Sequence, residues 1–433
     1  MSVARVRGLD ACSPTGAIAR VAGHDVEVRG LRLAVGDALT VHTGTGDRPA
    51  EVVGLGPEGV RALLLADTAG LARGDRVSVG GAASGVVVGE GLLGRTLDAL
   101  GRPVDGRGPL SGERVGLDLD VPPALARRRI TEPLPVGVRL VDTLATVGRG
   151  QRMGIFAGSG VGKSTLLGMM VRGTTADVNV VALIGERGRE VREFLEDDLG
   201  SEGMARTVVV VATSDEPPLV RLRAGFLATR IAEWFADRGA DVLLTMDSLT
   251  RLAMAQRDVG LAAGEPPTAR GYTPSVFTLL PRLLERAGPR TAGSITGFYT
   301  VLVEGDDMND PVADAARSIL DGHLVLDRRL ATAGRYPPID PLASLSRLAG
   351  KVVTPERRRA ATAARAALAA AAEVRDLVEV GAYAPGTNPE ADRGLALQPA
   401  IVDFLRQDSG EPAGFEDAWA RLAALVGDDQ EAP

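Results

Sequence analysis

Hydrophobic and polar positions follow different patterns in three successive parts of the chain. Up to residue 83, short apolar runs are separated by Gly, Pro and Asp turn residues, a pattern typical of a small β-barrel. The expected strands are Ala17–Val21, Val26–Val28, Ala38–Val41, Glu51–Leu55, Val60–Leu65 and Arg76–Val79. We therefore expect an N-terminal β-barrel domain over residues 1–83. A ligand-binding barrel is the alternative, but no cluster of candidate site residues marks this part.

From residue 84 the pattern changes to continuous apolar runs that alternate with helical stretches. Apolar strands between helices predict a parallel sheet that is buried on both faces, as in α/β proteins. We assign this domain to residues 84–352. The expected strands are Val178–Ile184, Thr207–Ala212 and Asp241–Met246, and the expected helices include Ser164–Val171 and Ala224–Phe235.

The last part of the chain, residues 353–433, is rich in alanine and predicts a C-terminal helical domain. It opens with Thr354-Pro355-Glu356, a combination that favours a helix start. The apolar stretch Ala366–Ala372 is flanked by Arg365 and Glu373, so we interpret it as a helix of a globular domain rather than a membrane span.

Composition narrows the classes of protein. The chain has 433 residues, a net charge of −7 and only 3% aromatic residues. These values disfavour a nucleic-acid binder, which usually carries a basic surplus and stacking platforms. The single cysteine, Cys12, allows no disulfide framework and fits a reducing compartment. Met1–Pro14 lacks a secretory signal, and no apolar run approaches the roughly 18–20 residues of a membrane span. We expect a cytoplasmic protein with at most peripheral membrane contact.

The strongest chemical signal is the glycine-rich run Ala157–Thr165, which follows the apolar Met153–Phe156 and precedes the helical Leu166–Val171. A strand, such a loop and a helix start form the context of a P-loop, in which backbone N–H groups surround phosphate oxygens. Lys163 is expected to reach the β- and γ-phosphates of ATP. The pattern usually has glycine where this chain has Ala157, which is tolerable if φ stays negative. The expected nucleotide-binding residues are Gly158, Ser159, Gly160, Val161, Gly162, Lys163, Ser164 and Thr165.

The cofactors expected with this loop are ATP and Mg²⁺. Ser164 offers a hydroxyl to Mg²⁺, and Asp247, at the end of an apolar strand, would hold the metal through its water shell. The alternative for Asp247 is a helix N-cap. Glu186 follows another apolar strand and could deprotonate the attacking water, while Arg187 could bind phosphate. The alternative is a solvated helix face of charge pairs, which we prefer for residues 189–193.

At this point the sequence resembles the type III secretion ATPases, which are related to the rotary ATP synthase catalytic subunit. The resemblance extends from about residue 16 to about residue 408. Its main motifs are Gly154–Leu167, Gly185–Phe194 and Met246–Arg251, joined by Gly264–Pro267, Gly271–Val276, Leu302–Asn309 and Ser318–His323. In the C-terminal part, Leu377–Tyr383 followed by Asn388-Pro389 matches the export branch rather than the ATP synthase branch.

The resemblance implies an α/β fold with a P-loop (RecA-like) core and assigns further roles. Glu186 matches the catalytic glutamate, and Arg187 matches the phosphate-contacting arginine beside it. Tyr336 matches the tyrosine that packs on adenine, with core packing as the alternative. Arg347 matches the arginine finger given to the neighbouring subunit, with a surface arginine on a turn as the alternative. Because one chain carries both Glu186 and Arg347, a homohexamer of identical subunits would suffice.

Within the family, Val191–Phe194 and Asp198–Gly200 favour a flagellar export ATPase, with the injectisome enzyme as the alternative. An RNA-translocating hexameric ATPase and a nucleotide-gated scaffold are less favoured. The resemblance implies a position at the inner face of the cell membrane and several partners: a stator or regulator protein, a coiled-coil stalk, export chaperones and substrates, and a membrane export gate. Stator contact through the weak apolar stripe of Val3, Val6 and Leu9 is the least supported of these.

The segment Asp258–Tyr272 matches the family's pore loop, where the stalk inserts. Its glycines and prolines disfavour a helix, so we expect the whole segment to form a loop. It carries little charge, which is compatible with apolar contact to a partner. An ordinary surface connection is the alternative.

Overall fold

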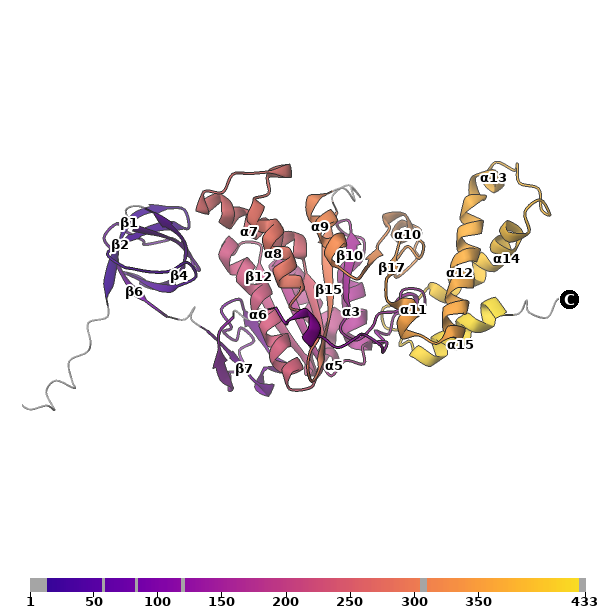
Figure 1. Cartoon of the computed structure of the whole chain (residues 1–433), viewed down its shortest axis with the longest axis horizontal. Helices are drawn as coiled ribbons and strands as arrows, with labels where there is room; N and C mark the ends of the chain where they lie inside the picture. Colours follow the sequence, from indigo (N-terminus) through magenta and orange to yellow (C-terminus); the bar gives the residue numbers. More distant parts are fainter. Residues whose placement is uncertain (1–13, 57–58, 82–84, 118–120, 304–309, 428–433) are drawn as a thin grey trace, which may run out of the picture.

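The computed structural model describes residues 14–56, 59–81, 85–117, 121–303 and 310–427. A barrel, an α/β core and a set of C-terminal helices follow one another along the longest axis of the molecule (Figure 1). This arrangement confirms the fold class predicted from the sequence. The residue numbers chosen for the domain boundaries stay predictions.

The N-terminal part is a closed antiparallel barrel with the strand order β1-β2-β5-β4-β3-β6. Alternate side chains fill its interior: Val26 and Val28 of one strand and Leu39 and Val41 of another are fully buried. This alternation is the period-2 pattern read from the sequence. The strands are β1 (Thr15–Ala22), β2 (Asp25–Arg29), β3 (Ala38–Thr43), β4 (Gly46–Gly56), β5 (Gly59–Leu64) and β6 (Arg76–Val79).

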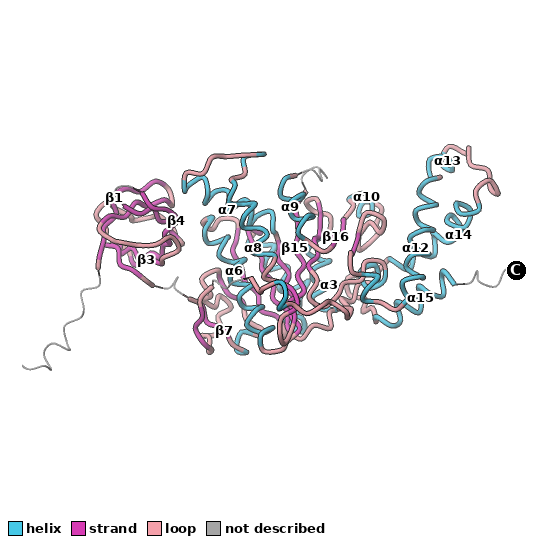
Figure 2. The backbone as a smooth tube through the Cα atoms, in the orientation of Figure 1, coloured by secondary structure: helices cyan, strands magenta, loops and turns pink. Residues whose placement is uncertain are grey.

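The core is built around a sheet with the order β17-β16-β10-β15-β13-β11-β12-β8, all parallel except the edge strand β17. Every residue of β11 is buried, because helices cover both faces of the sheet (Figure 2). The strands are β8 (Thr96–Asp98), β10 (Arg152–Ala157), β11 (Val178–Glu186), β12 (Thr207–Thr213), β13 (Asp241–Asp247), β15 (Ser294–Leu302), β16 (Gly322–Val325) and β17 (Leu345–Ser346). Short strands outside this path are β7 (Val86–Val88), β9 (Glu113–Val115) and β14 (Gly288–Pro289).

The two faces of the sheet bury different side chains of the same strand. In β11, Val180 and Ala182 belong to the hydrophobic core that includes α6 to α9, whereas Val181 and Leu183 belong to the one that includes α2 and α3. The helices on the first face are α6 (Pro218–Asp237), α7 (Leu249–Ala263), α8 (Pro274–Leu284) and α9 (Pro311–Ile319). The remaining helices of this domain are α2 (Arg139–Thr143), α3 (Lys163–Gly173), α4 (Gly188–Glu193), the π-helical η4 (Phe194–Leu199), α5 (Gly200–Ala205), α10 (Arg328–Thr332) and α11 (Ala349–Val352).

The first C-terminal helix, α12, begins where the sequence predicts a helix start. The Thr354 hydroxyl accepts a hydrogen bond from the Arg357 N–H at 3.4 Å, and Pro355 is the first helical residue. Arg365 ties this helix to the core by donating to the carbonyls of Pro341, Leu144 and Ser344 at 2.6 to 3.0 Å. The helices are α12 (Pro355–Glu373), α13 (Arg375–Glu379), α14 (Pro389–Leu405) and α15 (Phe415–Gly427).

One predicted element is wrong in part. The expected loop Asp258–Tyr272 begins as a helix, because α7 continues to Ala263 and ends at Gly264 with φ 94°. Gly260 is tolerated inside this helix because α8 approaches closely: a Cβ at Gly260 would lie 2.6 Å from the Thr273 hydroxyl oxygen. Tertiary packing therefore outweighs the helix propensity of glycine here.

Three features used in the sequence analysis lie outside the described residues: Cys12, the apolar stripe of Val3, Val6 and Leu9, and the motif portion 304–309. Within the ranges given above, no helix combines the length and the apolar character needed to cross a membrane.

Candidate active site

The P-loop lies between β10 and α3, as the motif predicts. Gly160 and Gly162 have φ values of 73° and 98°, which side-chain-bearing residues rarely adopt, so both positions require glycine. Ala157 is the last residue of β10 and has a negative φ, which explains why alanine is accepted there. The loop therefore turns its backbone toward the first turn of α3, where Lys163 and Ser164 lie.

Lys163 is the centre of a charged network at the carboxyl ends of neighbouring strands. Its Nζ lies 3.3 Å from Oε1 of Glu186, which ends β11, and contacts Oδ1 of Asp247, which ends β13. The Thr300 hydroxyl of β15 donates to the same Asp247 oxygen at 2.7 Å. The sheet thus brings Lys163, Glu186 and Asp247 together although up to 84 positions separate them in sequence.

Burial alters the acidity of Glu186, which is only 8% exposed. Desolvation raises the pKa of its carboxyl above the ordinary value, while the Lys163 ammonium acts in the opposite direction. The nearby Asp247 carboxylate adds to the rise, and Arg251, with Nε 3.5 Å from Glu186, opposes it. A carboxylate with a raised pKa is a better proton acceptor than an exposed glutamate.

The residues expected to hold Mg²⁺ fit that ion chemically. Asp247 is 2% exposed and supplies carboxylate oxygen, and Ser164 supplies a hydroxyl from the exposed first turn of α3. Mg²⁺ prefers hard oxygen ligands, keeps several waters and is usually held by one or two protein groups plus phosphate oxygens. Asp247 is not a helix cap: the hydroxyl of the next residue, Ser248, caps α7 by accepting from Arg251 N–H at 3.2 Å.

Arg187 lies at the N-terminus of α4 with an exposed side chain that pairs with Glu190 at 3.2 Å. It is next to the network, but it does not join Lys163. The exposed pairs Arg189–Glu193 at 3.4 Å and Arg192–Glu196 at 2.7 Å confirm the solvated charged face predicted for this helix.

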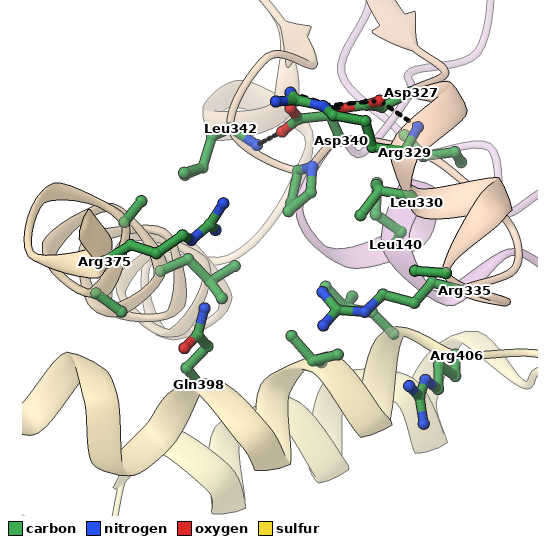
Figure 3. A pocket seen from close by; sticks show the side chains of 18 of the residues that line it. Leu140, Asp327, Arg329, Leu330, Arg335, Asp340, Leu342, Arg375, Gln398 and Arg406 are labelled. Atoms are coloured by element: carbon green, nitrogen blue, oxygen red, sulfur yellow. Dashed lines mark hydrogen bonds and ion pairs between the residues drawn. The ribbon is translucent and has the colours of Figure 1, made fainter. Parts of the chain in front are cut away.

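Tyr336 lies beside the P-loop and is 51% exposed, so the core-packing alternative is wrong. Its ring is 3.8 Å from the point where a Cβ on Gly162 would sit. Next to it, a cavity of about 710 Å³ opens between residues 327–342 and the helices α12 and α14. Figure 3 shows Arg335, Arg375 and Gln398 around this cavity.

Arg347 is exposed at the edge of the sheet, directly after β17. Its backbone N–H donates to Asp321 at 3.0 Å, and its guanidinium donates to the Arg317 carbonyl at 3.4 Å. Asp321 in turn bonds to Arg152, the first residue of β10. The P-loop follows the last residue of β10, so Arg347 lies at the opposite end of the strands from its own Lys163.

Three contacts of the site were not predicted. Arg251 stands in the quoted motif Met246–Arg251, yet the sequence alone gave no reason to place it against Glu186. Thr300 lies in an apolar strand without a motif. Arg328 donates to the carbonyl of Ser159 in the P-loop at 2.9 Å, a contact across 169 positions that no local pattern encodes.

Comparison with known proteins supports the interpretation of this geometry. Residues 137–346 match the model of the ATP synthase alpha/beta family, nucleotide-binding domain, and residues 353–424 match that of the T3SS EscN ATPase C-terminal domain. The flagellum-specific ATP synthase of Bacillus subtilis (strain 168) is 49% identical over 96% of both chains. The type 3 secretion system ATPase of Xanthomonas euvesicatoria is 49% identical over 95% of this chain and 94% of its own.

Solved structures agree with the fold. The assembled ATPase EscN of the enteropathogenic E. coli type III secretion system superposes with a TM-score of 0.90 at 44% identity, over 95% of this chain and 100% of its own. EscN in complex with its central stalk EscO gives a TM-score of 0.88 at the same identity and coverage. The chain therefore belongs to the type III secretion ATPase family, within the ATP synthase alpha/beta family, and is an ATP hydrolase.

Proposed function

We propose that Lys163, Glu186 and Asp247 form the catalytic centre for Mg-ATP hydrolysis. Lys163 binds the β- and γ-phosphates, and the buried carboxylate of Glu186 orients the attacking water and accepts its proton. Ser164 and Asp247 would hold Mg²⁺, which would supply positive charge against the charge that develops on the phosphates. The observation that carries this proposal is the convergence of all three charged groups at the carboxyl ends of β11 and β13.

The remaining roles complete the site. Gly158–Thr165 surround the phosphates, and Tyr336 packs on the adenine base. Arg187 is exposed next to Glu186 and is free to turn from Glu190 to the γ-phosphate. Arg347 is directed to the ATP of a neighbouring copy, because it lies at the far end of its own strands. A closed homohexamer places each Arg347 at the next subunit's P-loop.

We further propose that hydrolysis serves a flagellar protein export apparatus. The similarity to proteins described as flagellum-specific ATP synthases covers nearly the whole chain, which supports this branch. The complex of EscN with its central stalk supports a coiled-coil stalk as a partner of this chain. Export chaperones and substrates, a stator or regulator protein and a membrane export gate complete the proposed assembly, at the inner face of the cell membrane.

The cellular role is tested by replacing the native gene with a Glu186→Gln copy. The variant keeps the shape of the side chain and removes the base, so swimming and flagellar protein secretion should be lost while the protein accumulates normally. Glu193→Gln, the same chemical change on the exposed face of α4, is the matched control and should leave both unchanged. Normal swimming of the Glu186 variant would refute a role of hydrolysis in flagellar export. Loss of virulence-type secretion with intact swimming would assign the injectisome instead.

A further inference from the structure

The segment Arg406–Glu411, between α14 and α15, is a polar joint between the C-terminal domain and the core. At its centre lies Gln407, which is 3% exposed although it is polar. A buried amide is costly unless its hydrogen bonds are made, and here they all are. The side-chain carbonyl accepts from the Arg139 N–H at 2.9 Å, and the amide donates to Gly137 at 2.8 Å and Glu411 at 2.9 Å.

These contacts complete an element that lacks a cap of its own. Helix α2 starts at Arg139, and the apolar side chain of its N-cap residue Val138 cannot accept a hydrogen bond. Gln407 therefore caps α2 from 268 positions away. Helix α2 also binds the C-terminal part through its own side chain: the buried Arg139 guanidinium donates to the Phe404 carbonyl at 3.2 Å and contacts Glu411.

The joint also reaches the nucleotide site. The backbone N–H of Gln407 donates to the Tyr336 carbonyl at 2.9 Å. Two residues further on, the Ser409 carbonyl accepts from Arg172 at 2.6 Å, in the last turn of the P-loop helix α3. One short segment is thus bonded both to the residue carrying the exposed ring and to the helix that begins with Lys163.

We propose that Gln407 is a positioning residue for the nucleotide base: it locks Arg406–Glu411 onto α2, and the locked segment holds Tyr336 beside the P-loop. The proposal rests on the adenine-packing role proposed for Tyr336. Tyr336 is 51% exposed, so its ring is not enclosed by the core. Its main-chain bond to a buried, fully hydrogen-bonded residue therefore limits where the ring can lie.

The consequence is selective for the base. The P-loop binds the triphosphate, and none of the contacts described above joins Gln407 to Gly158–Thr165. Loss of Gln407 should weaken the interaction with adenine and leave that with the phosphates unchanged. A general loosening of the protein would weaken both.

The test measures KM and kcat for ATP and the inhibition constant of inorganic tripolyphosphate, which has phosphates but no base. Gln407→Leu keeps the size of the side chain and removes its polar atoms. We expect the KM for ATP to rise about tenfold, the scale of base–aromatic stacking, with kcat within about twofold. The tripolyphosphate constant should not change. Gln407→Glu, which keeps the acceptor and loses both donors, should change in the same direction and serves if the leucine variant does not fold.

Two further variants separate the possible failures. Arg365→Leu removes another tie of the C-terminal domain to core carbonyls without touching Arg406–Glu411, so it should leave the KM for ATP near that of the unmutated protein. Tyr336→Ala should show the base-selective rise. An unchanged KM for ATP in the Gln407 variants would overturn the proposal. So would a rise of KM in Arg365→Leu as large as that in Gln407→Leu, or a rise of the tripolyphosphate constant as large as that of KM. Each of these results would leave the role of Tyr336 intact. An unchanged KM in Tyr336→Ala would overturn the base role itself, and Gln407's with it.

Discussion

Arg347 provides a sharp test of whether the catalytic site is shared between subunits. Its N–H bonds to Asp321, which is level with Arg152 at the start of β10. The P-loop begins only after Ala157, the last of the six residues of that strand. At about 3.3 Å per residue, this places Arg347 roughly 20 Å from its own P-loop along the strand direction. Arg347 cannot serve the ATP bound to its own chain.

The expected loss of kcat follows from the way an arginine side chain stabilises charge on the γ-phosphate. An arginine finger contributes about 10³–10⁵ in kcat, so Arg347→Ala should lower turnover by at least about 10³ and leave ATP binding unchanged. Lys163→Ala subunits should be inactive for a different reason, because they would lack the ammonium proposed to bind phosphate. In a random 1:1 mixture, about one quarter of the interfaces of a ring join an intact Lys163 to an intact Arg347. Mixing should therefore restore activity to about that fraction if the sites act independently.

The assay compares steady-state ATP hydrolysis of each variant alone and of the two refolded or co-expressed together. The control for subunit exchange is a mixture of unmutated chain with a double variant that carries both Lys163→Ala and Arg347→Ala. If mixed rings form and activity stays at the level of the single variants, the shared-site account is wrong. Recovery to about one quarter would support it.

Three further predictions follow from other parts of the molecule. Arg286 and Glu233 form a buried pair with bonds of 2.7 and 2.8 Å, so Arg286→Leu should lower the free energy of unfolding by about 3–5 kcal/mol, measured by urea denaturation. Because burial raises the pKa of Glu186 and the base must be deprotonated, kcat should fall on acidification at a higher pH than an ordinary glutamate would cause; a profile flat down to the ordinary range would contradict this. Leu261, exposed in the last turn of α7, should be dispensable for basal hydrolysis, whereas Leu261→Ser should weaken stimulation by the stalk protein; full stimulation would exclude the contact.

The test of α7 replaces Leu261 alone and leaves the nearby Glu265 unchanged. The Glu265 carboxylate accepts from the Ser275 N–H at 3.0 Å, in the first turn of α8. Its replacement would disturb α8 whether or not a partner binds nearby. Leu261 alone tests the surface.

The parts of the site that sequence could predict are those encoded locally. Glycines at fixed spacing predict the P-loop. Glu186 and Asp247 end apolar strands, and the carboxyl ends of such strands meet at one edge of a parallel sheet. Tyr336 and Arg347 have no such local signal and came from resemblance to a family. Only the structure shows that Tyr336 lies beside the P-loop and that Arg347 lies far from it.

Contacts that cross the whole chain could not be predicted. Gln407 caps a helix 268 positions away, and neither end of that contact has a pattern of its own. The end of α7 was misjudged for a related reason. Intrinsic propensity disfavours Gly260 in a helix, but the close approach of α8, which requires glycine, decides the structure.

The central claim is that Glu186 is the base of an ATP-hydrolysing centre built on Lys163. A single-turnover experiment with Glu186→Gln tests it most directly, by following bound ATP and released phosphate in the same sample. The account predicts ATP binding close to that of the unmutated protein and phosphate release slower by about 10² or more, the scale of a lost general base. Phosphate release at the unmutated rate would contradict the assignment of Glu186.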